Sequence, residues 1–521
     1  MKTKNIISRI LAAAFIAAVF ASCGNKAPAA VSPESGLPAD FKITIMVNDW
    51  TGSPNSGEYG ARCLELLKQY TGYDIDVWWV TSDNYNDKLA TLLVSGKEAM
   101  PKILSAGARP IVINAAANGA FWPVEDYLTD SQAYPNLSRQ SSKIRQAFSA
   151  NGHQFGPLMQ ANTVGRYGFG YRADWAEKLG ISEPYTIDDV YNLLYAFTYN
   201  DPDGNGKKDT YGLNLCSYTG PLDVMQTWFG VGNKWADDGN GNIIPVHKTP
   251  EYMEALRWFK KLYDNGLIAS DWAIRDTASW KQDNYNSIAG VYIDCTDDVK
   301  NIWDYYEQNG VKSVVDPAKT ATMVMLPGIA KDKNSPRVTL ASPPTGGFAI
   351  TRAAENEAEV KACLDFLDKM CNDEALMVVL RGLENIHWKY NEAGEVDRIN
   401  PGDTLLHKSY NGLNQLTPYI PNRFPVKYKF ARDVQTQLQE DTFAASEKIG
   451  VFNPAIGYYT NAATYITNGS SLDLIIEDAR IQYIVGDINE SGLKSAWDLW
   501  ERTGGADLIK EVNALIKADK S

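Results

Sequence analysis

The sequence predicts an α/β fold with more than one domain, on the strength of three observations. The chain has 521 residues, of which 44% are hydrophobic, so it holds enough apolar material for more than one core. Strand-like runs alternate with helical patterns after residue 41, which is typical of a parallel sheet with helices on its faces. From about Tyr171 the pattern changes to longer helices, which indicates a second structural unit.

The first unit begins with a mostly apolar run that suits a buried strand. A helical pattern follows, and Gly72 stands directly after it, where a glycine often ends a helix. The alternation then continues through two more strands. The expected elements are a strand at Lys42–Val47, a helix at Glu58–Tyr70, a strand at Asp74–Val80, a helix at Tyr85–Val94 and a strand at Lys102–Ser105.

Helix boundaries are sharper in the second unit. Thr186 and Asp189 have the spacing of a capping box, in which two side chains satisfy free N–H groups at the start of a helix. Thr249-Pro250 predicts another helix, with Thr249 as N-cap and Gly266 at the end. Further expected elements are strands within Asn286–Asp294 and Ala341–Thr351, and helices near Phe430–Lys448 and Lys494–Lys517, the last broken at Gly504-Gly505.

The first 40 residues are not expected to belong to the fold. A basic start and the apolar run Ile10–Phe20 have the form of a signal peptide. The tetrapeptide Phe20-Ala21-Ser22-Cys23 resembles the lipobox of bacterial lipoproteins, which implies cleavage after residue 22 and diacylation of Cys23. An ordinary signal with an incidental Cys is the alternative. Residues 24–40 are rich in Pro, Ala and Ser and predict a flexible tether. We therefore expect a lipoprotein on the extracytoplasmic face of the cell membrane.

Charge and cysteine content exclude some classes of function. The net charge of −13 argues against nucleic acid or an anionic membrane surface as the main partner, because both favour a basic face. The remaining cysteines are five in number and none forms a CxxC pair, which favours buried free thiols over a disulfide framework, although one bridge is compatible with the sequence. They are Cys63, Cys216, Cys295, Cys363 and Cys371.

One loop has the spacing of a calcium site. Oxygen-bearing residues occupy positions 1, 3, 5 and 9 of a calcium-binding loop, Gly206 occupies position 6, and Lys207 would supply its backbone carbonyl. The usual carboxylate at position 12 is replaced by Gly212. The predicted ligands of a structural Ca²⁺ are Asp201, Asp203, Asn205, Lys207 and Asp209. A polar turn without an ion is the alternative. The similar segment Asp237–Asn242 lacks this order and predicts a hairpin turn.

Three stretches resemble one family when they are taken together and in order. They are Tyr171–Gly212 (YRADWAEKLGISEPYTIDDVYNLLYAFTYNDPDGNGKKDTYG), Thr249–Ser270 (TPEYMEALRWFKKLYDNGLIAS) and Gly346–Thr351 (GGFAIT). The chain resembles the extracellular solute-binding lipoproteins of ABC importers, in the family 1 group associated with oligosaccharide uptake. One departure is that Lys97 and Lys102 stand where this group has acidic residues, so no ligand contact is carried over to that loop.

The resemblance implies a periplasmic-binding-protein-like fold of two lobes joined by crossing strands. The expected N-terminal lobe comprises residues 41–165 and about 335–395, and the C-terminal lobe comprises residues 166–334 and about 396–521. A ligand would bind between the lobes, which would close on it by a hinge motion. The resemblance further implies a non-enzymatic, monomeric protein that delivers an oligosaccharide to the transmembrane subunits of an ABC permease.

Candidate binding residues are aromatic or acidic and lie in loops or at strand ends. A sugar presents flat apolar faces ringed by hydroxyl groups, so its site needs aromatic plates beside amide or carboxylate acceptors. Trp50 follows the first strand, and Tyr167 lies in a glycine-punctuated stretch that would cross between lobes. The candidates are Trp50, Tyr167, Trp228, Trp272, Trp280, Asp294 and Trp388, whereas Trp175, Trp258, Trp497 and Trp500 have helical spacing and are expected in the core.

Two other function classes remain open at this point. An exported glycosidase needs only a pair of carboxylates, and 63 acidic residues do not exclude one. No G-x-S-x-G, H-E-x-x-H or P-loop motif is present, and His153, His247, His387 and His407 are not spaced for metal. A receptor lipoprotein that presents bound sugar to a sensor would use the same closed cleft as a transport protein.

Overall fold

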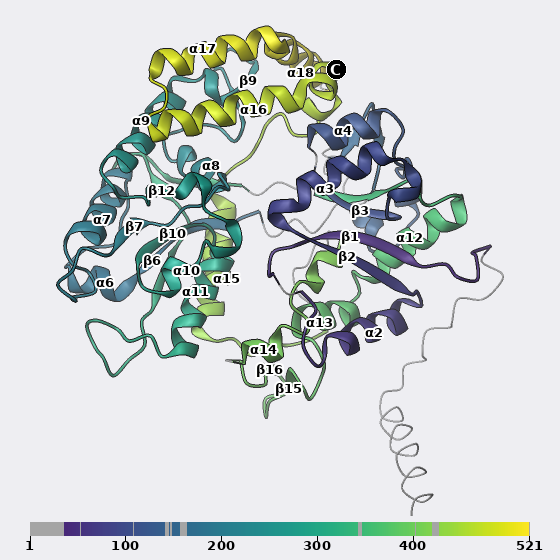
Figure 1. The fold of residues 1–521 in the computed structure, drawn as a ribbon, viewed down its shortest axis with the longest axis horizontal. Helices are drawn as coiled ribbons and strands as arrows, with labels where there is room; N and C mark the ends of the chain where they lie inside the picture. Colours follow the sequence, from purple (N-terminus) through teal and green to yellow (C-terminus); the bar gives the residue numbers. More distant parts are fainter. Residues whose placement is uncertain are drawn as a thin grey trace, which may run out of the picture.

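The computed structural model describes residues 36–519, apart from residues 53, 108, 141–144, 146–147, 157–163, 342–345, 402 and 419–426. Figure 1 shows two separate sheets, each surrounded by helices, with one helix reaching over both halves. The signal peptide, Cys23 and the first part of the tether lie outside the described residues. Within the described ranges, no helix combines the length and apolar character needed to cross a membrane.

The N-terminal lobe is built on a four-stranded sheet with the order β14-β3-β1-β2. The first three strands along the chain are parallel and are connected by helices, as the alternation predicts, because a parallel pair needs a long crossover. The fourth strand comes from a distant part of the chain and pairs antiparallel with β3. The strands are β1 (Ile43–Asp49), β2 (Ile75–Thr81), β3 (Ile103–Gly107) and β14 (Gly346–Ile350).

Helices cover both faces of this sheet. Gly72 ends α2 in the left-handed conformation with φ 80°, and its N–H donates to the Lys68 carbonyl oxygen at 2.8 Å, which confirms the predicted cap. The helices are α2 (Gly60–Thr71), α3 (Ser82–Ser95), α4 (Pro110–Ala117), α12 (Glu357–Lys369), α13 (Asp373–Arg381) and α14 (Thr404–His407). Small antiparallel pairs join β4 (Ser149–Ala150) to β5 (His153–Gln154), and β15 (Trp388–Tyr390) to β16 (Val396–Arg398).

Core packing shifts the expected lobe boundaries. Leu413 and Leu416, in the short helix η9 (Leu413–Leu416), are fully buried in the cluster that covers β1 and β3. They therefore belong with the N-terminal lobe, later in the chain than the boundary expected near residue 396. Leu340 packs in the main cluster of the C-terminal lobe, so the boundary expected near residue 335 also lies later. Leu413 and Leu416 thus pack in the N-terminal core although they were expected in the C-terminal lobe, and Leu340 packs in the C-terminal core although it was expected in the N-terminal lobe.

The C-terminal lobe is built on a second four-stranded sheet, with the order β11-β6-β10-β7. This sheet is mixed, because β6 runs antiparallel to both β10 and β11 while β7 runs parallel to β10. Gly168 and Gly170 of β6 leave no room for a Cβ, which would meet Thr296 and Val299 of the overlying helix α11. The strands are β6 (Tyr167–Arg172), β7 (Tyr211–Leu213), β10 (Ala289–Cys295) and β11 (Met323–Leu326).

Two predicted helix starts differ in their capping. Thr186 and Asp189 form the full capping box at α7. Thr249 precedes α9 as predicted, but its hydroxyl donates to the Val246 carbonyl oxygen at 2.8 Å and makes no cap hydrogen bond. The helices of this lobe are α6 (Ala173–Lys178), α7 (Ile187–Tyr199), α8 (Gly220–Thr227), α9 (Pro250–Asp264), α10 (Gln282–Tyr285), α11 (Thr296–Asn309) and α15 (Val434–Lys448).

Shorter strands complete this lobe. Asp237 and Ile243 pair across the predicted hairpin turn, which joins β8 (Trp235–Asp237) to β9 (Ile243–Pro245). A small sheet places β13 between β12 and β17, and β13 and β17 lie where the chain leaves for the other lobe. These strands are β12 (Ile329–Ala330), β13 (Arg337–Leu340) and β17 (Gly450–Val451).

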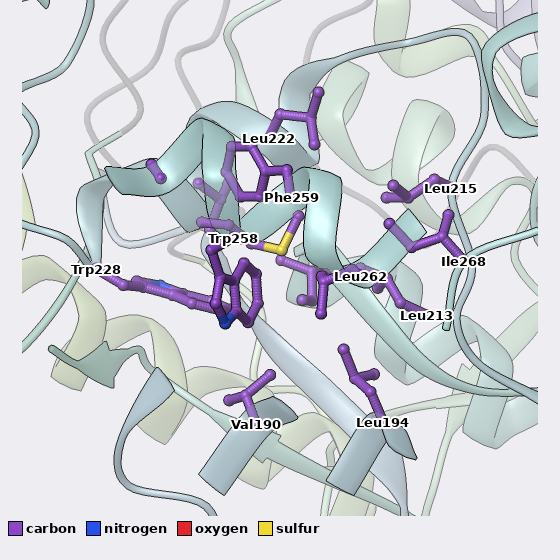
Figure 2. Close-up of a cluster of buried hydrophobic side chains, with 14 of the residues drawn as sticks. Val190, Leu194, Leu213, Leu215, Leu222, Trp228, Trp258, Phe259, Leu262 and Ile268 are labelled. Atoms are coloured by element: carbon purple, nitrogen blue, oxygen red, sulfur yellow. The ribbon is translucent and has the colours of Figure 1, made fainter. Parts of the chain in front are cut away.

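The C-terminal lobe has the larger aromatic core. Figure 2 shows Trp228 and Trp258 packed among the leucines of this cluster, with Phe259 beside them. Trp175, Trp258 and Trp500 are buried as expected, and Trp497 is partly buried against the same cluster. The five described cysteines are all buried and free, which confirms the thiol prediction.

Helix α16 (Ala463–Val485) connects the two lobes. Near its start, Ile466 packs in an N-terminal-lobe cluster, and its carbonyl oxygen accepts a hydrogen bond from Asn114 of α4 at 2.9 Å. Near its end, Tyr483 and Ile484 pack in the main cluster of the C-terminal lobe. Figure 1 shows α16 at the top of the molecule, with one end beside α4 and the other near α9. The chain then forms α17 (Glu490–Trp500), a π-helical turn (Glu501–Gly505) and α18 (Ala506–Asp519), with the predicted break at Gly504, where φ is 124°.

Candidate binding site between the lobes

On the N-terminal lobe, the turn after β1 presents an exposed tryptophan. Asp49 is buried, and its Oδ1 accepts hydrogen bonds from the N–H groups of Thr51 (2.8 Å) and Gly52 (2.9 Å), which fixes the turn. Trp50 lies in this turn with 59% of its side chain exposed, and its indole N–H donates to Gln415 Oε1 at 3.3 Å. The turn therefore holds a large aromatic face toward solvent, at the carboxyl edge of the sheet.

The same edge of the sheet lies against the other lobe. Ser82, at the start of α3, donates to Asn48 Oδ1 at 2.9 Å and so ties the helix to the end of β1. The next residue, Asp83, accepts a hydrogen bond at 2.9 Å from Thr277 in η8 (Thr277–Ser279) of the C-terminal lobe. This contact between lobes places the Trp50 turn at their junction.

On the C-terminal lobe, Asp294 near the end of β10 is the central polar group. Its side chain is 5% exposed, and its Oδ1 has no hydrogen-bond partner among the described residues. Burial, followed by the nearby charge of Asp298, raises the pKa of this carboxyl to about 7, while Arg166 opposes the shift. A buried carboxyl oxygen without a partner is costly, and a ligand hydroxyl group would satisfy it.

Tyr218 lies beside Asp294 and is partly open to solvent. Its ring is 43% exposed, yet Asp294 and then burial raise the pKa of its phenol well above the usual value. Tyr167 lies close to Tyr218, and it starts β6 directly opposite Cys295 of β10.

Trp280 forms the floor beneath Tyr218. Its ring is 6% exposed, lies 6.1 Å from the Tyr218 ring in an edge-to-face arrangement, and lies 4.6 Å from the Tyr292 ring. The indole N–H donates to the Asn214 carbonyl oxygen at 3.1 Å, which fixes the ring orientation. These contacts make Tyr218 a supported aromatic surface, as a stacking platform requires.

Charged side chains form a rim around Asp294 and Tyr218. The Arg166 guanidinium donates to Asp297 Oδ2 at 2.7 Å, and Gln439 of α15 donates to the other oxygen of the same carboxylate at 2.9 Å. Lys281 pairs with Asp298 at 2.7 Å. Each of these cations is already engaged by a carboxylate, so the rim offers fixed donors and acceptors with little free charge.

The structure groups some of the predicted residues and separates others. Tyr167, Trp280 and Asp294 lie together around Tyr218, and Trp50 faces the junction from the other lobe. The three remaining candidates lie inside lobe cores: Trp228 and Trp272 are each 1% exposed in the main cluster of the C-terminal lobe, and Trp388 is 5% exposed in a small cluster with Met377 and Val396. We leave these three out of the proposed binding surface.

Sequence reasoning missed Arg166 and Tyr218. Tyr218 follows β7 in the segment Cys216–Gly220 before a short helix, a position after a strand that the search for tryptophans overlooked. A Cβ at Gly220 would meet the Tyr218 ring, so the glycine makes room for the ring to fold back over its own loop. A glycine two residues after an aromatic residue in a loop was the available signal.

The predicted calcium loop lies on the surface of the C-terminal lobe. The Asn205 amide nitrogen lies 2.6 Å from Asp203 Oδ2 and 3.2 Å from both oxygens of Asp209, where an ion would lie. In the described part of the chain, no three His, Cys, Asp or Glu side chains are arranged to hold a metal. The donor set nevertheless suits Ca²⁺, because turning the Asn205 amide over would direct its oxygen toward the two carboxylates.

Comparisons with known proteins agree with this architecture. The profile of the bacterial extracellular solute-binding protein family matches residues 55–368. Lipoprotein LipO of Bacillus subtilis (strain 168) is 34% identical over 505 residues, which cover 94% of this chain and 95% of LipO. The polygalacturonan/rhamnogalacturonan-binding protein YtcQ of the same organism is 27% identical over 508 residues, 96% of each chain.

A solved structure shows the same fold. The ABC-transporter substrate-binding protein FusA of S. pneumoniae, in complex with kestose, matches with a TM-score of 0.63 and 18% identity over 92% of this chain and 99% of FusA. At this identity the likeness concerns the two-lobe fold alone. Together with the family match and the extensive identity to LipO, it leads to one conclusion. The chain belongs to the family of bacterial extracellular solute-binding proteins.

Proposed function

We propose that this chain captures an oligosaccharide between its two lobes and delivers it to an ABC permease. Membership of a solute-binding family supports the capture of a small molecule. The names of two relatives support carbohydrate as the ligand class: YtcQ is a polygalacturonan/rhamnogalacturonan-binding protein, and FusA is a fructooligosaccharide ABC transporter substrate-binding protein. Closure of the lobes would exclude water from the bound sugar and create the shape that the permease recognises.

One observation favours a hydroxyl-rich ligand above all others. Among the residues that the structure describes, Asp294 Oδ1 is buried without a partner, and the partly exposed ring of Tyr218 lies beside it, so an acceptor and an aromatic face lie next to each other. Sugar hydroxyl groups can donate to the carboxyl oxygen while the apolar face of the ring packs on the tyrosine. In this arrangement Trp50 supplies a second aromatic face from the opposite lobe.

Isothermal titration calorimetry with a panel of di- to hexasaccharides tests this proposal. We expect saturable binding of at least one glycan, and binding weaker by about fivefold to a hundredfold in Tyr218→Ala, because one aromatic stacking surface is worth on the order of 1–3 kcal/mol. Tyr195→Ala is the matched control, since Tyr195 is 45% exposed on the outer face of α7. Equal losses in both variants, or no binding to any glycan by the parent protein, would refute the assignment.

We propose that the bound glycan leaves chemically unchanged. Binding proteins of importers hold and release their ligand, so no product is expected. Chromatography of each bound glycan after prolonged incubation with stoichiometric protein checks this, and the appearance of shorter saccharides would replace the proposal with a hydrolase.

We also propose that the Asp201–Asp209 loop binds a structural Ca²⁺. The donor spacing supports this, as does a solved neighbour, a FusA EF-hand mutant from S. pneumoniae in complex with fructo-nystose, which matches with a TM-score of 0.62 and 18% identity over 92% of this chain and 99% of FusA. Asp201, Asp203, Asn205 and Asp209 would contribute side-chain oxygens and Lys207 its carbonyl oxygen. The ion would neutralise carboxylates that otherwise repel one another. Burial and then the adjacent Asp201 and Asp209 raise the pKa of Asp203 in their present arrangement.

The proposed cellular arrangement follows from the N-terminal segment. The mature chain would begin at a diacylated Cys23 and act as a monomer on the extracytoplasmic face of the membrane, beside its permease. The name of the relative LipO supports a lipoprotein. Cys23→Ala should move the protein from the detergent phase to the aqueous phase in a detergent-partitioning assay.

A further inference from the structure

An arginine that follows a strand of the N-terminal sheet is the starting point. Arg109 stands two residues after β3, and its side chain is exposed. Its backbone is extended, with φ −88° and ψ 152°, because the next residue, Pro110, disfavours the helical conformation before it. The side chain folds back over the strand, since a Cβ on Gly107 would lie 3.2 Å from Arg109 Nε. Arg109 therefore has a defined place at the carboxyl edge of the sheet.

Contacts on two sides place this edge at the junction of the lobes. On the side of β2, Asp83 accepts the 2.9 Å hydrogen bond from Thr277 of the C-terminal lobe. On the side of β3, Pro110 packs against Gly469 of α16, where an added Cβ would lie 3.0 Å from the Pro110 Cβ. Figure 1 shows α4, which begins at Pro110, beside α16. Arg109 lies next to the second contact, on the strand of the sheet that is nearer to α16.

The same edge carries the exposed tryptophan of the N-terminal lobe. Trp50 and Arg109 follow β1 and β3, which are neighbouring parallel strands. Adjacent strands of a sheet lie about 4.8 Å apart. An aromatic ring and a cation are thus presented side by side, and a sugar ring packed on Trp50 would have its substituents within reach of the Arg109 side chain.

Arg109 has no counter-charge in the described part of the chain. Its guanidinium makes no hydrogen bond or ion pair there, and desolvation by the surrounding protein lowers its pKa, with Tyr85 opposing the shift. Two carboxylates lie at the same edge, but both already accept hydrogen bonds. Asp49 is held by the N–H groups of its own turn, and Asp83 is held by Thr277. The positive charge of Arg109 is therefore available to a ligand.

The cations of the opposite lobe differ from Arg109 in this respect. Arg166 donates to Asp297 at 2.7 Å, and Lys281 pairs with Asp298 at the same distance. Of these three cations beside the proposed binding site, Arg109 is the one that the protein leaves without a carboxylate. An anionic group of a ligand would therefore be directed to the N-terminal lobe, and hydroxyl groups to Asp294.

Closure of the lobes makes this difference matter. A guanidinium that is withdrawn from water without an anion carries a large desolvation penalty. A hydroxyl group compensates for this only in part, because it carries no charge. A planar carboxylate can accept two parallel hydrogen bonds from the planar guanidinium and neutralise it. The closed state therefore favours a ligand that brings a carboxylate to Arg109.

We propose that Arg109 binds a carboxylate of the ligand, and that the ligand is an acidic oligosaccharide whose uronic acid ring packs beside Trp50. This inference rests on the proposed function and adds the substrate class. Trp50 would hold the apolar face of the acidic ring, while Arg109 would hold its carboxylate.

Matched glycans test the substrate class. The probes are tetragalacturonate and tetramannuronate, each compared with its carboxyl-reduced neutral form, together with neutral di- to hexasaccharides, all titrated calorimetrically into the full mature chain. We expect at least one uronate to bind about tenfold to a hundredfold more tightly than its reduced partner, as a charge-assisted hydrogen-bonded pair requires. Binding of neutral glycans without a preference for either uronate would overturn the inference while the proposed function stands. No binding by any probe would refute both.

Variants of Arg109 test the residue itself. Arg109→Met should lower the affinity for the preferred uronate to that of its reduced partner, and should leave the reduced partner unaffected. Added salt should then weaken uronate binding in the parent more than in the variant. Arg109→Gln keeps hydrogen-bond donors without the charge and should show the same loss if Arg109→Met folds poorly.

A matched arginine far from the sheet edge is the control. Arg502 is exposed in the π-helical turn before α18, and Arg502→Met should keep the full preference for the uronate. A preference that survives in both Arg109 variants, or that is lost equally in Arg502→Met, would overturn the assignment of the carboxylate to Arg109.

Discussion

The burial of Asp294 should make the protein less stable as pH rises. The folded protein holds this proton more tightly than the unfolded chain, because the pKa is raised from 3.8 to about 7. The stabilising contribution is therefore complete below pH 4 and is lost as pH rises through about 7. The difference between the two pKa values corresponds to about 4 kcal/mol of unfolding free energy. About 3 kcal/mol of this is lost between pH 5 and pH 8.

The substitution Asp294→Asn removes this titration while it keeps the size of the side chain. Urea unfolding followed by tryptophan fluorescence, at pH 5 and at pH 8 without ligand, gives the free energy of unfolding for both proteins. We expect the free energy of unfolding of Asp294→Asn, relative to that of the parent, to be about 3 kcal/mol higher at pH 8 than at pH 5.

A surface carboxyl provides the control for this experiment. Asp498 is exposed on α17, and Asp498→Asn removes the same formal charge. The difference in unfolding free energy between Asp498→Asn and the parent should be nearly the same at both pH values. If the unfolding free energies of the parent and Asp294→Asn change in parallel with pH, Asp294 is not the buried acid that the structure describes.

Three further predictions concern other parts of the molecule. Gly220→Ala should displace the Tyr218 ring, which occupies the space of the new Cβ, and so weaken glycan binding while the melting temperature stays within a few degrees; unchanged affinity would contradict this. Asp174→Ala should cost about 3–5 kcal/mol in urea unfolding, because it leaves the buried Arg172 guanidinium without the two 2.8 Å hydrogen bonds that it now makes; a cost below 1 kcal/mol would show that the pair is not structural. A chelator should lower the melting temperature of the parent but not of Asp203→Ala. Equal melting curves of the parent with and without chelator would refute the proposed calcium site.

Local chemistry made much of the fold predictable. The Thr186 capping box, the Gly72 cap and the break at Gly504 each depend on a few adjacent residues, so the sequence alone indicates them. The mixed sheet of the C-terminal lobe was not predicted, because antiparallel pairing of β6 with β10 depends on contacts between distant segments. The place of Leu413 in the N-terminal core was missed for the same reason.

The candidate site was predictable only in part. Trp50 and Asp294 were found because the end of a strand is a position that periodicity reveals. Trp228 and Trp272 lie in irregular or short segments, as surface residues would, yet they are buried, since the direction of a side chain in a loop depends on its tertiary neighbours.

Helix α16 acts as a brace whose length sets a limit on lobe motion. Its 23 residues span about 34 Å between the contact with Asn114 at one end and the packing of Tyr483 at the other. Swinging one lobe by about ten degrees around the far end would shift the near end by about 6 Å, twice the length of a hydrogen bond. Wide opening must therefore exchange the Asn114 contact for another, so part of the energy that distinguishes the open and closed states resides in this helix, outside the sugar itself.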